Sequence, residues 1–161
     1  MATEIRKWFN KALKEIAPEY TGSIINVGAG PDEDNEGNHY KDYFVNADSY
    51  KTLDAYYDKC DYDNIDDLSL NSFDVVLNFW VLEHVFNMFD FIHKLSLICK
   101  KTLIIAVPVR YEYHPAPGDY WRFTFEGIEK LLKKYNFMIE KFNQYEDEKH
   151  HGILIIAEKL T

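Results

Sequence analysis

Short β-branched, apolar runs alternate along this chain with amphipathic segments, and this alternation limits the fold more than any other feature. The spacing of apolar residues predicts four strands and three helices before residue 136. The expected strands cover 24–27, 44–47, 74–79 and 103–107, and the expected helices cover 5–16, 87–101 and 125–135. A strand that returns to the same sheet through a helix runs parallel to its predecessor, with helices on both faces. An α/β fold with a doubly wound, mostly parallel sheet is therefore expected.

The C-terminal end departs from this alternation. Two further strands are predicted at 138–142 and 153–158, with no helical pattern between them. Strands joined without a crossover helix pair as a hairpin. We expect an antiparallel hairpin at the C-terminal edge of the sheet. Sheets of this kind bind ligands at the carboxyl ends of their central strands.

The length and the charge set the broad class. The 161 residues predict one domain, 1–161, with an N-terminal helix over 1–18 and a ligand-binding core over 24–161. The formal net charge of −9 argues against binding to nucleic acid or to an anionic membrane. No apolar run is long enough to span a bilayer, and Cys60 and Cys99 have no metal or redox spacing. A cytoplasmic protein with a small-molecule partner is expected, and its oligomeric state stays open.

A glycine turn follows the first predicted strand. Gly28, Ala29 and Gly30 come directly after 24–27, and Asp48 follows the second predicted strand 18 residues beyond Gly30. This layout is typical of a nucleoside-binding crevice, in which small residues let the ligand approach the backbone and an acid binds the ribose hydroxyls. A plain turn after a strand is the alternative interpretation.

The charges after this turn favour one class of cofactor. Residues 31–36 carry four carboxylates, and no Lys or Arg occurs before Lys41. A pyrophosphate needs positive potential at such a turn. S-adenosylmethionine has no phosphate, and it carries a sulfonium and an ammonium group. The sequence therefore favours S-adenosylmethionine over NAD.

Two segments carry a family resemblance. Residues 72–77 read Ser-Phe-Asp-Val-Val-Leu, and residues 81–85 read Val-Leu-Glu-His-Val. They resemble the "sFDvVl…vLEHv" signature of class I S-adenosylmethionine-dependent methyltransferases of the UbiE, or type 11, kind. Residues 114–124, His-Pro-Ala-Pro-Gly-Asp-Tyr-Trp-Arg-Phe-Thr, are similar to a further hallmark of one branch of that group. The resemblance covers roughly residues 24–137 and implies a Rossmann-like fold.

The resemblance implies cofactor roles for particular residues. Those that match the family's cofactor positions are Gly28, Ala29 and Gly30 at the methionine part and ribose, Asp48 at the ribose hydroxyls, Asp61 and Tyr62 at the adenine, and Asn78 and Phe79 beneath the sulfonium. Asp63 and Asn64 compete with Asp61 and Tyr62. The chain also departs from the family pattern, with Asn26 in place of an acid and Pro31 directly after the turn.

The loop after the 103–107 strand holds the candidate substrate residues. These are Tyr113, His114, Tyr120, Trp121 and Arg122. A histidine with a pKa near neutral can remove a proton from a hydroxyl or an amine, so His114 is the candidate base. The alternative for Asp119 and Arg122 is structural, since they could pair to brace the loop. His84 could approach the reaction centre, or Glu83 and His84 could pack at the start of the helix after residues 74–79. The six histidines and the acidic stretch 58–67 show no recognised metal spacing, so no metal is expected.

The sequence thus predicts transfer of a methyl group from S-adenosylmethionine to a small molecule by in-line displacement. The rival hypothesis is a degenerate member of the fold that binds the cofactor, or serves as a partner or regulatory protein, because the glycine turn is altered. A nucleotide-sugar or NAD enzyme on a similar sheet is disfavoured by the charges at the turn.

Overall fold

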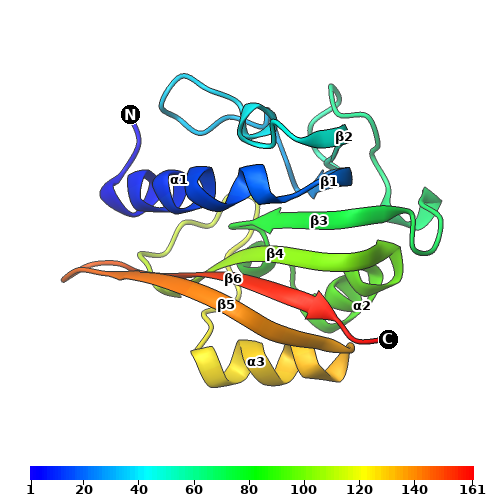
Figure 1. The fold of residues 1–161 in the computed structure, drawn as a ribbon. Helices are drawn as coiled ribbons and strands as arrows, with labels where there is room; N and C mark the ends of the chain where they lie inside the picture. Colours follow the sequence, from blue (N-terminus) through cyan, green and yellow to red (C-terminus); the bar gives the residue numbers. More distant parts are fainter.

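One six-stranded sheet organises the computed structural model, which describes residues 1–161. The strands are β1 (Gly22–Val27), β2 (Ala47–Leu53), β3 (Phe73–Phe79), β4 (Cys99–Arg110), β5 (Phe137–Glu146) and β6 (His151–Lys159). They lie in the order β2-β1-β3-β4-β6-β5, and the first four are parallel to one another (Figure 1). β6 pairs antiparallel with both β4 and β5. The mostly parallel sheet and its antiparallel edge hairpin are confirmed.

Three α-helices and four short 3₁₀ segments complete the fold. They are α1 (Glu4–Ile16), α2 (Met88–Ile98), α3 (Phe125–Lys134), η1 (Ala17–Glu19), η2 (Tyr40–Tyr43), η3 (Ile65–Asp67) and η4 (Leu82–His84), and α1 and η1 precede the first strand. The hydroxyls of Thr3 and Thr124 cap α1 and α3 by accepting from backbone N–H groups in the first turn. No helix of the chain has the length and apolar character that a membrane span requires.

Helices cover both faces of the sheet, as the alternation predicts. α1 lies on one face, while α2 and α3 lie on the other (Figure 1). Phe9 and Leu13 of α1 pack against Leu77 and Ile104 of the central strands. The opposite apolar cluster joins Leu95 of α2 and further side chains of α3 to the other face. Because both faces are buried, the middle of β4, residues 103–107, is entirely apolar.

The prediction of a strand at 44–47 is wrong. β2 begins at Ala47 and continues to Leu53, and Phe44 instead packs against the ring of Tyr50. β2 is an edge strand whose Asp48 and Lys51 face solvent, so its sequence lacks the apolar run that marks a buried strand. No α-helix joins β1 to β2, and the acidic segment between them contains only η2.

Two predicted boundaries also shift around β4. The helix predicted over 87–101 is α2, which ends at Ile98, where the Lys159 ammonium donates to the carbonyls of Ser96 and Cys99. Cys99 already belongs to β4 and pairs with Phe73 of β3. At its other end β4 continues through Pro108, where the sequence predicts its end. Pro108 is tolerated because β3 has already ended beside Ala106, so no parallel neighbour needs its missing N–H.

Candidate functional site

Two adjoining cavities lie at the carboxyl ends of the parallel strands. The first, the turn cavity, has a volume of about 360 Å³ and is lined by Val27, Gly28, Leu53, Asp54, Ala55, Tyr56, Asp63, Asn64, Ile65, Trp80, Val81, His84, Val85, Phe91 and Pro117. The second, the loop cavity, has a volume of about 330 Å³ and is lined by Thr3, Ile5, Arg6, Trp80, Glu83, His84, Pro108, Tyr111, Glu112 and His114. Trp80 and His84 line both cavities. The two spaces therefore meet at these side chains.

Of the glycine turn, Gly28 lines the turn cavity, whereas Ala29 and Gly30 line neither cavity. Gly28 has a φ of +80°, and a Cβ at this position would lie 2.4 Å from a methyl carbon of Val81. Glycine is required here by both the backbone conformation and the close approach. Gly30 has a φ of +51° with open space where a Cβ would lie, and its N–H donates to Asp54.

The acid beside the turn is Asp54, and the prediction of Asp48 is wrong on position. Asp48 is exposed near the start of β2, at the opposite end of the strand from the turn, because the strand begins later than predicted. Asp54 directly follows β2 and accepts hydrogen bonds from the N–H groups of Gly30 and Tyr56, each at 2.8 Å. The carboxylate is thereby fixed at the rim of the turn cavity.

The end of β3 also differs from the prediction. Asn78 is buried and donates to the carbonyl of Val27, and Phe79 packs on the α1 face against Phe9. Neither lines the turn cavity or the loop cavity. The next residue, Trp80, has a φ of +57°, a conformation that a non-glycine residue rarely adopts. This backbone turn lets the Trp80 indole line both cavities.

The loop that follows β2 places the two candidate pairs for the adenine, Asp61–Tyr62 and Asp63–Asn64, in different surroundings. Asp61 accepts from the backbone N–H and the hydroxyl of Thr52, so its carboxylate ties the loop to the strand edge. Tyr62 forms backbone hydrogen bonds with Thr52 and Asp54. Asp63 and Asn64 line the turn cavity, whereas Asp61 and Tyr62 do not.

The acidic residues after the glycine turn face away from the turn cavity. Asp32 is buried and accepts from Asn26 and from the Tyr50 hydroxyl, while burial raises the pKa of its carboxyl. Asp34 is also buried and accepts from the Tyr43 hydroxyl. Asp54 and Asp63 are the carboxylates of the turn cavity, and no Lys or Arg lines it. Its charge favours a cationic ligand over a pyrophosphate.

Internal hydrogen bonds brace the loop that carries the candidate substrate residues. Arg122 pairs with Asp119 and donates to the carbonyls of Tyr111 and Glu112. Hydrogen bonds from Arg122 hold the pKa of the Asp119 carboxyl well below its usual range. The same carboxylate accepts from the backbone N–H of His114. Asp119 and Arg122 therefore pair and brace the loop, as the structural alternative predicts.

Of the five candidate substrate residues, His114 alone lines the loop cavity. Tyr113 and Tyr120 are 74% and 51% exposed and line neither cavity. The indole N–H of Trp121 donates to the carbonyls of Val85 and Phe86, and Trp121 and Arg122 line a separate groove beside α3. The loop's backbone path directs these side chains away from the cavities.

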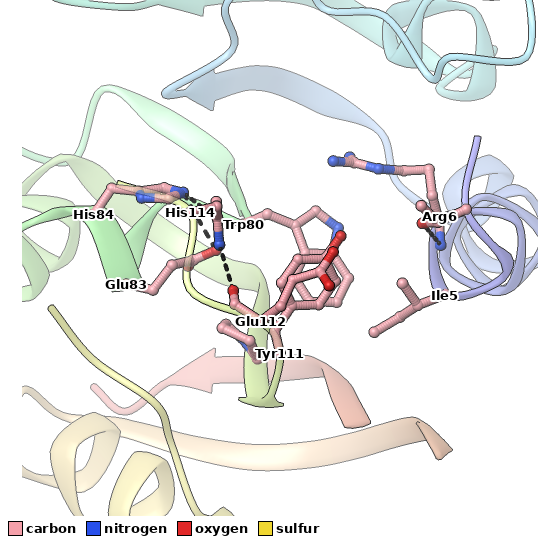
Figure 2. A pocket seen from close by; sticks show the side chains of 10 residues that line it. Ile5, Arg6, Trp80, Glu83, His84, Tyr111, Glu112 and His114 are labelled. Atoms are coloured by element: carbon pink, nitrogen blue, oxygen red, sulfur yellow. Dashed lines mark hydrogen bonds and ion pairs between the residues drawn. The ribbon is translucent and has the colours of Figure 1, made fainter. Parts of the chain in front are cut away.

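Glu83 and His84 lie in η4 rather than at the start of an α-helix, and they meet His114 at one end of the loop cavity (Figure 2). The Nε2 atoms of the two histidines are 3.3 Å apart, and Nε2 of His84 is 3.7 Å from Oε1 of Glu83. Glu83 is 2% exposed, and burial raises the pKa of its carboxyl to about 7. The structure thus joins residues 30 positions apart in the sequence.

Sequence reasoning missed several residues that line the cavities. Asp54 was missed because the polar edge strand before it has no apolar pattern to mark where the strand ends. The available signal was an acid directly after the apolar residue Leu53. Trp80 and Val81 directly follow the predicted strand 74–79 and could have been included with its end. Arg6 comes from α1, and no local motif links that helix to the site (Figure 2).

Comparisons with known proteins place this architecture. The chain matches no protein-family model and no curated protein. A protein from Bacillus halodurans that is described as a putative methyltransferase superposes with a TM-score of 0.72 at 13% identity. The match covers 94% of this chain and 98% of that one. A Listeria monocytogenes protein, described as a putative S-adenosylmethionine-dependent methyltransferase, gives 0.69 at 15% identity over 99% and 100%.

A third similar structure was determined with ligands. It is the 1,6-didemethyltoxoflavin-N1-methyltransferase of Burkholderia thailandensis, with bound 1,6-didemethyltoxoflavin and S-adenosylhomocysteine. Its TM-score is 0.68 at 15% identity, and the match covers 96% of this chain and 81% of that one. At these identities the likeness concerns the fold. The chain shares a Rossmann-like fold with these methyltransferase structures.

Proposed function

We propose that this protein transfers a methyl group from S-adenosylmethionine to a small-molecule acceptor. The observation that carries the proposal is the meeting of two cavities at Trp80 and His84. A two-substrate transfer needs adjoining spaces for donor and acceptor, so that the reacting atoms are held in line. The turn cavity suits the donor, and the loop cavity suits the acceptor.

The residues of the turn cavity fit the donor in charge and in shape. Carboxylates of Asp54 and Asp63, together with the absence of Lys and Arg from the lining, suit a ligand with a sulfonium and an ammonium group. A carboxylate has about four acceptor positions, and the two backbone N–H groups on Asp54 leave room for two ribose hydroxyls. Asp63, Asn64 and Ile65 would hold the adenine in place of Asp61 and Tyr62.

S-adenosylmethionine supplies an activated methyl group and its own leaving group when bound. The protein's residues therefore act mainly by alignment and by exclusion of water. Trp80 would separate and orient the two ligands, and its indole N–H is buried without a protein partner. His114 would accept the proton of a hydroxyl or amine acceptor through Nε2, which adds roughly 10²–10⁴-fold to the rate. The free thiols of Cys60 and Cys99 suit a reaction in the reducing cytoplasm.

Titration calorimetry and thermal shift with S-adenosylhomocysteine and NAD test the donor assignment. S-adenosylhomocysteine at millimolar concentration should raise the melting temperature, because a ligand that binds only the folded state stabilises it. NAD should not, because its pyrophosphate meets carboxylates without a compensating cation. A shift with NAD and none with S-adenosylhomocysteine would contradict the proposal.

A second assay tests turnover. The protein is incubated with S-adenosylmethionine and a panel of hydroxylated and amino metabolites, and a coupled hydrolase converts the product S-adenosylhomocysteine into adenosine and homocysteine. The metabolite that gives homocysteine is the acceptor. Binding of S-adenosylhomocysteine with no release over a broad panel would favour a protein that only binds the cofactor.

A further inference from the structure

Glu83, His84 and His114 place three potential metal ligands in one cluster. One ligand atom from each residue lies within 4.8 Å of the others. Figure 2 shows the three side chains converging from η4 and from the loop after β4. The second carboxylate oxygen of Glu83 is buried and has no hydrogen-bond partner. A buried carboxylate oxygen without a partner is costly, and a cation held by both carboxylate oxygens of Glu83 would satisfy it.

The hydrogen bonds of the two imidazoles determine which nitrogen atoms are free. Nδ1 of His84 contacts the carbonyl of Gly118, and Nδ1 of His114 lies 3.0 Å from the carbonyl of Glu112. A carbonyl only accepts hydrogen bonds, so each Nδ1 carries a proton and donates it. In the neutral rings each Nε2 is then an acceptor. Two unprotonated nitrogens face each other at 3.3 Å, next to a carboxylate.

This arrangement repels itself unless a positive charge lies between the three groups. A metal ion between the two imidazoles satisfies this requirement, as a proton shared by them would. The ligand atoms of all three residues lie within 4.8 Å of one another, so the Glu83 carboxylate would have to move closer to His114 to complete the set. Two nitrogens at about 2.0–2.1 Å from a tetrahedral zinc ion are about 3.3–3.4 Å apart, which is the separation of the two Nε2 atoms. The 3.7 Å from Nε2 of His84 to Oε1 of Glu83 is slightly wider. Histidine ligands of metals typically donate their other N–H to a carbonyl, as both histidines do here.

We propose that Glu83, His84 and His114 form a binding site for a divalent transition-metal ion of the zinc type, with one coordination position open to the loop cavity. Two imidazoles and one carboxylate are the ligand set of many catalytic metal sites. The open position faces a cavity of about 330 Å³, so a water or a donor atom of a bound molecule completes the coordination. With an ion bound, His114 is a ligand and no longer the proton acceptor.

Titration calorimetry on protein dialysed against a chelator tests the site, with zinc chloride as the probe. We expect about one zinc ion per chain and no binding of magnesium, which prefers oxygen ligands. His114→Ala and Glu83→Gln should each weaken zinc binding at least tenfold. His151→Ala is the matched control, because His151 lies near the carboxylate of Glu146 but outside the cluster, and it should bind as the unmodified protein does.

Cobalt(II) spectroscopy keeps the test valid if a variant does not fold. Cobalt bound to the unmodified protein should give the intense visible absorption of a four-coordinate ion, and zinc should abolish it. The proposal is overturned if the unmodified protein binds no zinc, if cobalt gives only the weak spectrum of a six-coordinate ion, or if His151→Ala loses as much affinity as His114→Ala. Binding of S-adenosylhomocysteine is measured without metal, so failure of this site leaves the methyl-transfer proposal intact.

Discussion

Asp54 and Asp48 differ in position by six residues, yet they lie at opposite ends of β2. Asp54 touches the glycine turn through Gly30, whereas Asp48 is exposed at the other end of β2. If Asp54 binds the ribose hydroxyls, Asp54→Ala should weaken S-adenosylhomocysteine binding at least tenfold, because a hydrogen bond to a charged acceptor contributes about 1.5–3 kcal/mol. Titration calorimetry measures the change.

Asp48→Ala is the matched control and should leave the affinity unaltered. Asp54→Asn retains an acceptor for the Gly30 N–H, so it separates loss of the charge from disruption of the glycine turn. Equal effects of the two alanine substitutions would refute the ribose assignment.

At the scale of an element, the loop from Tyr111 to Phe123 depends on one ion pair. The side chain of Asp119 is 1% exposed and accepts from Arg122 and from the His114 backbone. Asp119→Asn should lower the free energy of unfolding by about 1–3 kcal/mol, since hydrogen bonds between charged groups are lost. Urea unfolding of the variant and the unmodified protein measures this difference.

The same pair predicts a pH dependence with a definite sign. The folded-state pKa of Asp119 is lowered, so its stabilisation is complete above the unfolded pKa of about 3.9 and declines as the pH falls below that value. The stability difference between the unmodified protein and Asp119→Asn should therefore be constant near neutral pH and shrink in acid. A difference that grows on acidification would contradict the ion-pair account.

At the scale of the whole molecule, α1 is the only α-helix on its face of the sheet, and Phe9 is its main anchor (Figure 1). The Phe9 ring is fully buried and contacts the rings of Tyr40, Phe79 and Trp80 at centroid distances of 5.0–5.8 Å. Phe9→Ala should lower the free energy of unfolding by about 3–5 kcal/mol, because it leaves a cavity between the layers.

Because Phe9 contacts Trp80, the same substitution should also weaken ligand binding at the two cavities. Urea unfolding and calorimetry measure the two effects. Leu70→Ala, at a side chain that is 67% exposed, is the control and should change neither. Stability that is unaffected by Phe9→Ala would show that α1 does not hold this layer.

The sequence by itself determined the architecture of this protein. β-branched runs, helical spacing and the final pair of strands predict the sheet and its antiparallel edge, because burial of the central strands on both faces imposes an apolar pattern that is visible residue by residue. The position of the glycine turn was also predictable, since the conformation of Gly28 excludes other residues. The expected preference for a ligand without phosphate rested on the shortage of cations near the turn and on the carboxylates of residues 31–36, and those carboxylates do not line the turn cavity.

The tertiary structure alone decided which side chains make the site. Asp54 replaced Asp48 because a solvated edge strand carries no apolar signature, so its ends cannot be located from sequence. The carboxylates of Asp32 and Asp34 turned inward because Asn26, Tyr43 and Tyr50 bind them there. His84 of η4 contacts His114 and Gly118, which both lie in the loop after β4. These contacts require η4 and the loop to be adjacent in space. Such contacts arise from three-dimensional proximity, and no local pattern in the sequence encodes it.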